Sequence, residues 1–270
     1  MRLFLSGLRK LVRRPATYIT FGLMVGLLAL ILFAVGATAG RPEAGPGARA
    51  ALLLVTFPGA YTLILSFILG LGGLFALIYG AAVAGSEWSW GTLKSAVARG
   101  ESRSRYQLIS FAAIALMLGV ALALALVAGV AVAVVAANIA GVSTAGLGDS
   151  ATLGTLPELL GRGWIAMIEE GALGFAIATL ARSQLAGIGV GIAVYFGEQF
   201  AVIFLPDIVK YGPFNAAQAV VATDQSAFSG GGGASIPTLE PNSALFVVLI
   251  WLVGALLISA IFTERAEISG

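Results

Sequence analysis

Long runs of apolar residues, separated by short polar segments, dominate the pattern along this chain. Six runs reach about 20 residues, the length that a helix needs to cross the roughly 30 Å core of a bilayer. The third run is longer than a crossing requires and should tilt or project beyond the membrane, and the fourth is the shortest. The runs cover residues 17–37, 57–84, 107–137, 163–181, 184–205 and 243–263. This pattern predicts an all-α membrane protein with six transmembrane helices in a single domain, residues 1–270.

The composition supports this class and excludes several others. Hydrophobic residues make up 59% of the chain and charged residues 10%, with a mean hydropathy of +0.99. A soluble domain carries about a quarter charged residues. Cysteine and histidine are absent, which excludes disulfides, thiol nucleophiles, the usual zinc ligand sets and imidazole acid–base chemistry. Most enzyme classes are therefore excluded, and we expect no metal site.

Lysine and arginine are unevenly distributed over the predicted connections. With six spans, eleven of them fall on the side of the two termini and four on the opposite side. The positive-inside rule then places both termini in the cytoplasm. The eleven are Arg2, Arg9, Lys10, Arg13, Arg14, Lys94, Arg99, Arg103, Arg105, Arg182 and Arg265, and the four are Arg41, Arg49, Arg162 and Lys210.

Residues 1–15 have the pattern of an amphipathic helix. At about 100° per residue, one arc is apolar and carries Phe4, Leu5, Leu8, Leu11 and Val12. The opposite arc is basic and carries Arg2, Arg9, Lys10, Arg13 and Arg14. Such a helix lies in the membrane interface, with the basic face at anionic headgroups, and Pro15 ends it. We therefore predict an interfacial helix, the alternative being a basic flank that only sets topology.

Residues 85–106 form the one long polar stretch on the predicted cytoplasmic side. Residues 92–99 can form two helical turns that end at Gly100 in a left-handed cap. Leu93 and Val97 lie four residues apart and form an apolar pair on this helix. A short helix with an apolar pair and flanking charges, held between two spans, is suited to docking into a groove on a soluble partner.

This loop resembles the cytoplasmic loop of ABC-2-type transporter permeases, the membrane-spanning subunits of ABC exporters. In that family an acidic residue precedes the string G-T-[LI]-[KR], and a later G-x-[ST]-R follows. The matching residues here are Glu87, Gly91, Thr92, Leu93, Lys94, Gly100, Ser102 and Arg103. Ser102 is also a favourable residue to cap the next helix. The alternative is a charge cluster that sets topology and matches by chance.

The resemblance implies a coupling helix in this loop that contacts an ATPase subunit. It implies a permease that works with two ATPase copies and a second permease, as a homodimer or heterodimer, in the bacterial cytoplasmic membrane. ATP and Mg would be bound by the ATPase, since the chain has no Gly-x-x-x-x-Gly-Lys-Ser/Thr string and is not expected to be an enzyme by itself. Membrane lipid is an expected partner and nucleic acid is not. The implied coupling residues are Glu87, Gly91, Thr92, Leu93, Lys94, Val97, Arg99 and Arg103.

Four polar residues fall inside the predicted spans. Counted at about 1.5 Å per residue from residues 163 and 205, they share a depth of about 10 Å below the outer boundary. Ionisable groups at such depths usually face a bundle interior or a cavity. We therefore consider two hypotheses, an externally accessible acidic vestibule on the translocation path or carboxylates that sit in the outer interface. The residues are Glu169, Glu170, Glu198 and Gln199.

Two other functions remain as alternatives. A secondary transporter would use charged residues near the midplane, but it usually shows inverted repeats, which we do not find. An intramembrane enzyme is suggested by Glu169-Glu170, which resembles the paired glutamates of CAAX-type proteases. That pattern requires an arginine where this chain has Gly174, and histidines that it lacks.

Small residues and the longest connection complete the pattern. Gly22-x-x-x-Gly26 and Gly187-x-x-x-Gly191 allow close approach of helices, and we expect packing within the chain rather than a dedicated dimer interface. Residues 206–242 are predicted to form an extracytoplasmic loop with a flexible glycine run at 230–233.

Overall fold

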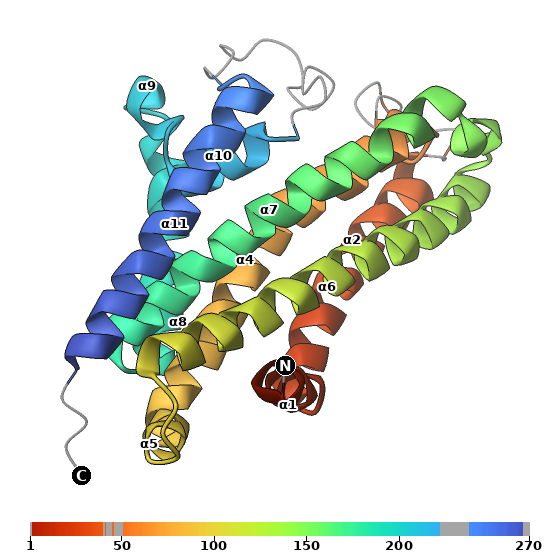
Figure 1. Ribbon diagram of the computed structural model, residues 1–270. Helices are drawn as coiled ribbons and strands as arrows, with labels where there is room; N and C mark the ends of the chain where they lie inside the picture. Colours follow the sequence, from red (N-terminus) through yellow and green to blue (C-terminus); the bar gives the residue numbers. More distant parts are fainter. Residues whose placement is uncertain (1, 40, 42–44, 46–50, 222–237, 267–270) are drawn as a thin grey trace.

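The computed structural model describes residues 2–39, 41, 45, 51–221 and 238–266 as a bundle of long helices (Figure 1). The predicted glycine run at 230–233, the position of Arg49 and the side chain of Arg2 lie outside this description. The elements are α1 (Arg2–Val12), α2 (Pro15–Ala39), η1 (Leu52–Leu54), α4 (Gly59–Ser89), α5 (Thr92–Val97), α6 (Arg103–Ala140), η2 (Ala145–Gly148), α7 (Ser150–Ala181), α8 (Gln184–Ala201), α9 (Pro206–Val209), α10 (Pro213–Ala219) and α11 (Pro241–Arg265).

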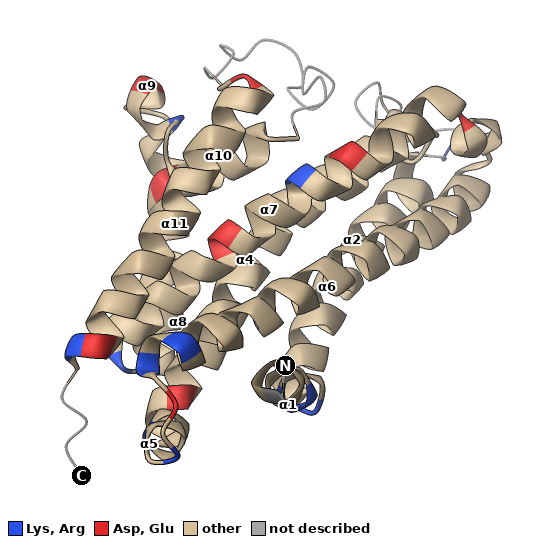
Figure 2. Cartoon of the chain, viewed as in Figure 1, with Lys and Arg blue, Asp and Glu red and all other residues tan. Residues whose placement is uncertain are grey.

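The long helices run alternately between two ends of the bundle. One end, which we name the α5 end, carries α1, α5 and the last residues of α11 (Figure 1). The other, the α10 end, carries α9 and α10. Figure 2 shows the lysine and arginine positions concentrated at the α5 end. The two described ends of the chain therefore lie on the same, basic side of the bundle.

Five of these helices are long and apolar enough to cross a bilayer, namely α2, α4, α6, α7 and α11. The chain is therefore a multi-pass, all-α membrane protein. The run predicted as a span over residues 184–205 forms α8, an 18-residue helix that ends at Ala201. It is not among the five candidate spans, so the described residues contain a helix that is long and apolar enough for five of the six predicted spans.

The ends of the spans follow local capping chemistry. The break between α1 and α2 falls before Pro15, as predicted, and α6 ends at Gly141, whose φ is 69°. α7 begins well before the predicted residue 163, because Asp149 caps it by accepting the backbone N–H of Thr152 at 2.9 Å. The hydroxyl and backbone hydrogen bonds from Thr152 hold the pKa of the Asp149 carboxyl below its usual value.

α4 and α7 form the centre of the bundle and approach each other at glycines. A Cβ atom on Gly80 of α4 would lie 2.1 Å from the carbonyl oxygen of Gly171 in α7. A Cβ atom on Gly174 would lie 2.0 Å from the carbonyl oxygen of Leu77. These two helices are the most buried candidate spans, whereas α2 and α11 expose most of their apolar surface. Lipid can cover that surface, since acyl chains are as apolar as leucine.

The two glycine pairs singled out in the sequence behave differently. Gly187 packs against Ala178 and Gly191 packs against Leu77, so internal packing is confirmed for this pair. At Gly22 and Gly26 a Cβ atom would meet nothing within 4 Å, so the prediction of packing within the chain is wrong for that pair. α2 buries its other face, through residues such as Met24, Leu28 and Leu32.

Candidate functional site

Glu87 is the centre of a polar junction at the α5 end. It lies in the last turn of α4 and is only 4% exposed. Its carboxylate accepts hydrogen bonds from Lys10 of α1, from the hydroxyl of Thr92 of α5 and, at 2.6 Å, from the hydroxyl of Tyr106 of α6. One buried carboxylate therefore ties four helices together.

Arg14, between α1 and α2, adds a second set of contacts to this junction. Its guanidinium donates to the hydroxyl of Ser86 at 2.8 Å and lies 3.5 Å from the Glu87 carboxylate. It also lies over the ring of Trp90, 5.0 Å from the ring centre. Since burial of a charge is costly without partners, the positive charges and the carboxylate stabilise each other.

These contacts correct the prediction that the whole basic face of α1 meets lipid headgroups. Lys10 and Arg14 are engaged by Glu87, and only Arg9 and Arg13 among the described basic side chains of residues 2–14 are exposed. The apolar face is also divided. Leu11 is buried in the core and Phe4 packs against it, whereas Leu5 and Val12 are exposed.

The predicted short helix is present as α5. It starts after Gly91, which adopts a left-handed conformation with φ of 63°. The turn that follows α5 ends at Gly100. This residue has a φ of 86°, so the predicted left-handed cap is confirmed.

The apolar pair on α5 does not face outwards as predicted. Leu93 is 1% exposed and Val97 is only half-buried. Leu93 and Ala96 form the inward face of the helix, while Lys94 and Arg99 are exposed. Leu93 therefore anchors α5 to its own chain, and the surface open to a partner is polar and basic.

Arg103 belongs to a different contact from the one predicted. It donates to the backbone carbonyls of Glu264, at 3.2 Å, and Ala266, at 2.7 Å, at the end of α11. In return the Glu264 carboxylate accepts the backbone N–H of Ser104 at 3.0 Å. Ser102 is the N-cap residue of α6, as predicted, but its hydroxyl makes no capping hydrogen bond, and Glu264 supplies the acceptor instead.

A cavity of about 300 Å³, lined by both polar and apolar residues, lies beside Glu87, among α1, α4, α5 and α6. Lys10, Thr92, Tyr106 and Arg99 contribute to its walls. Because α5 borders this space on one side, the helix is not packed against the bundle over its whole surface.

Glu169 and Glu170, in the middle of α7, are fully buried, and within the described chain their carboxylates have no hydrogen-bond partner. Glu170 occupies a notch in α4, because a Cβ atom on Gly73 would lie 2.1 Å from its Oε2 atom. These two carboxylates are therefore not accessible from the surface of the described chain, and whether they line a translocation path stays a prediction. An unpaired carboxylate in such a place costs several kcal/mol, so it needs a proton or a cation to offset the charge.

Glu198 has a structural role that the sequence did not reveal. Its carboxylate accepts the backbone N–H of Asn215 at 2.6 Å, the Asn215 side-chain amide at 2.7 Å and the backbone N–H of Phe214 at 3.3 Å. It thus caps the start of α10. Gln199 is half-buried, and its amide nitrogen has no hydrogen-bond partner among the described residues.

The partners of Glu87 were missed by sequence reasoning. Lys10 and Arg14 lie more than 70 residues before Glu87, at sequence separations of 77 and 73, and nothing in the local pattern joins them. Tyr106 is 19 residues away on the far side of α5. The available signal was the charge balance, since basic residues outnumber acidic ones in the segments at this end of the bundle, which favours an ion pair for a glutamate there.

Among the described residues, no group of three or more aspartates and glutamates is placed to hold a metal ion. A comparison of the sequence with protein-family models and with curated proteins finds no match.

Proposed function

We propose that this chain is the permease subunit of an ABC exporter of the ABC-2 type. In this proposal the α5 end faces the cytoplasm of a bacterial cell and α5 is the coupling helix that a separate ATPase contacts. The observation that carries the proposal is α5 itself, a short helix held between two spans by Glu87, with a basic outer surface. The concentration of basic residues at this end supports its cytoplasmic location (Figure 2).

The proposal includes α8 as a sixth crossing. Its 18 residues give a length of about 27 Å, slightly short of the hydrocarbon core. Five crossings would leave the two ends of the chain on opposite sides, whereas α1 and the end of α11 lie at the same end (Figure 1). The return of the chain from the α5 end to the α10 end along α8 supports the sixth span.

The contacts around Glu87 supply a route for coupling. A force on α5 would act on α4 through the Thr92–Glu87 hydrogen bond and on α1 through the Lys10–Glu87 ion pair. The buried Leu93 makes α5 move with the chain rather than independently. Two ATPase copies, with their ATP and Mg, and a second permease would complete the transporter.

Charge reversal on the outer face of α5 tests the proposal. We expect Lys94→Glu with Arg99→Glu to reduce both the ATPase that co-purifies with the chain and ATP-dependent transport in vesicles. Arg41→Glu is the matched control, because Arg41 is an exposed basic residue just after α2, which runs away from the α5 end (Figure 1). Leu93 is unsuitable, since a charge at this buried position would disturb folding. Transport by the chain alone, without an ATPase, would contradict the proposal.

A secondary transporter is the second candidate, and the buried Glu169–Glu170 pair favours it. Carboxyl groups inside a membrane bundle without partners are typical of proton or ion pathways. Transport that depends on a proton gradient, and is lost in Glu170→Gln, would support this candidate. Unchanged transport in Glu170→Gln and Glu198→Gln would remove both residues from the path.

A further inference from the structure

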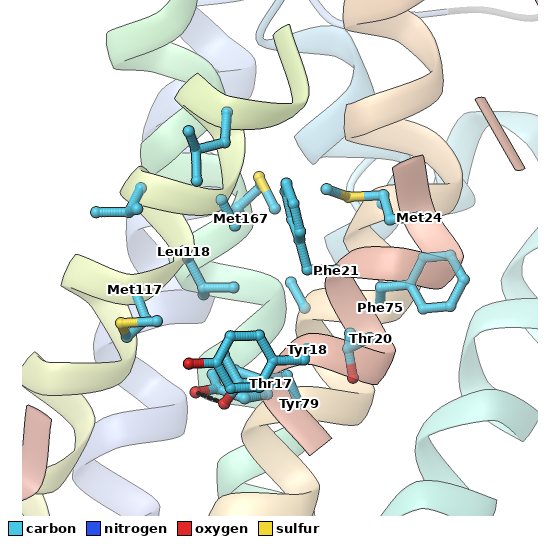
Figure 3. A pocket seen from close by; sticks show the side chains of 15 residues that line it. Thr17, Tyr18, Thr20, Phe21, Met24, Phe75, Tyr79, Met117, Leu118 and Met167 are labelled. Carbon is cyan, nitrogen blue, oxygen red and sulfur yellow. Dashed lines mark hydrogen bonds between the residues drawn. The ribbon is translucent and has the colours of Figure 1, made fainter. Parts of the chain in front are cut away.

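An apolar pocket of about 140 Å³ lies among α2, α4, α6 and α7, away from the Glu87 junction (Figure 3). Three of the four methionines of the chain line it, Met24, Met117 and Met167, together with Phe21 and Phe75. Methionine side chains are flexible and polarisable, so they adapt to guests of irregular shape. The lining is therefore suited to an apolar guest without a fixed outline.

The pocket opens on the surface between α2 and α6. Tyr18, Val120 and Leu124 belong to its lining and are 62%, 45% and 50% exposed. α2 and α6 are both candidate membrane spans, so this mouth faces the lipid rather than water. A guest would enter sideways, from the bilayer.

At the end of the pocket nearest α1, two hydroxyl groups are hydrogen-bonded to each other. The hydroxyls of Thr17 and Tyr79 lie 3.1 Å apart there (Figure 3). Thr17 already donates to the carbonyl oxygen of Leu11 at 2.7 Å, so Tyr79 is the donor to Thr17. Arg13 is exposed four residues before Thr17, at the turn from α1 into α2. A positive charge thus lies four residues before Thr17, a residue of the pocket lining.

The size of the pocket restricts its occupant. Sites for drug-sized molecules measure about 300 Å³ or more, whereas a cavity of about 150 Å³ holds a group of the size of benzene. A volume of about 140 Å³ therefore accommodates a segment of one acyl chain. An acyl chain in this space would make dispersion contacts with the lining, and acyl chains are the apolar molecules that surround the candidate spans.

We propose that this pocket is a lipid site, which takes part of one acyl chain of an anionic phospholipid whose headgroup lies at Arg13. Moving a chain from lipid into an apolar pocket gains little hydrophobic free energy, because both surroundings are apolar. Selectivity then comes from the headgroup, at about 1 kcal/mol per basic residue near the surface, or about fivefold in affinity.

Photo-crosslinking tests this site. The full-length chain would be placed in vesicles with a trace of phosphatidylglycerol that carries a diazirine on one acyl chain, or with phosphatidylcholine that carries the same chain. Labelled residues would be identified by peptide mass spectrometry. Met24 and Met167 are diagnostic, since they are 3% and 1% exposed and bulk lipid cannot reach them. We expect both to be labelled, by phosphatidylglycerol about fivefold more than by phosphatidylcholine.

Two substitutions in α6 provide the matched pair. Ala121 lines the pocket, and Ala121→Phe should fill its mouth and abolish labelling of Met24 and Met167. Ala131 is exposed on the same helix and outside the lining, so Ala131→Phe should leave labelling unchanged. Arg13→Gln should lower the preference for phosphatidylglycerol about fivefold.

Several outcomes would overturn the site. Label that is absent from Met24 and Met167 in the unaltered chain would do so, as would label that persists in Ala121→Phe. Equal labelling by the two lipids would overturn the headgroup assignment. Because the unaltered chain can also be tested by competition with unlabelled phosphatidylglycerol, the result does not depend on the folding of a variant.

Discussion

Two buried regions of this protein contain glutamates, and their surroundings are opposite. Glu87 receives hydrogen bonds from three other helical elements and lies next to two positive charges. Glu169 and Glu170 are buried at least as deeply and receive none within the described chain. Burial of a glutamate therefore has different consequences in the two regions. The hydrogen-bond partners of Glu87 let its carboxylate join helices, whereas Glu169 and Glu170 lack such partners among the described residues and their burial costs free energy.

The largest expected effect is at Glu87. Glu87→Ala leaves Lys10 and Arg14 beside an emptied site, and removal of one member of a buried ion pair costs about 3–5 kcal/mol. We expect the free energy of unfolding to fall by about 3 kcal/mol, measured by denaturation in detergent. Glu87→Gln retains the size and should cost less. Equal stability of Glu87→Ala and the unaltered chain would show that the junction does not hold the helices.

The notch at Gly73 gives the next largest effect. Gly73→Ala puts a methyl group where the Glu170 carboxylate lies, and overpacking of this kind costs about 1–3 kcal/mol. Adding Glu170→Ala to Gly73→Ala should restore part of that loss. A double-mutant cycle with purely additive changes would indicate that the two residues do not touch.

The smallest expected change in the free energy of unfolding is at Glu170, and it is an increase. This change of sign distinguishes the two regions most clearly. Glu170→Met replaces an unpaired carboxyl by an apolar side chain of similar length, and should raise the free energy of unfolding by about 1 kcal/mol. Glu87→Met is the matched variant and should lower it. If both variants are destabilised alike, Glu170 has partners that offset its charge.

The sequence was sufficient to predict most of the helices and several of their ends. The break at Pro15, the short helix after Gly91 and the left-handed Gly100 were all predicted from local capping and turn chemistry. These features depend on a few neighbouring residues. The candidate spans follow from hydropathy alone, with two differences. α8 is not among the candidate spans, and α7 starts before the predicted residue 163.

The packing could not be predicted in the same way. In a bilayer, lipid and neighbouring helices are both apolar, so the pattern does not tell which face of a span meets protein. For this reason Gly22 and Gly26 were expected to pack within the chain and are exposed. Leu93 of α5, outside the spans, was expected to face a partner and is buried, because a short helix can pack its apolar residue against its own chain as well as against another. The pairing of Lys10 with Glu87 depends on helices that are distant in the sequence.

The glycine contacts between α4 and α7 have a mechanical consequence. With carbonyl oxygens occupying the space of the missing side chains at Gly80 and Gly174, a shift of one helix along the other would drive neighbouring side chains into the opposing backbone. We therefore expect α4 and α7 to keep their relative position. A conformational change that opens a path across the membrane would then move the outer helices relative to this central pair.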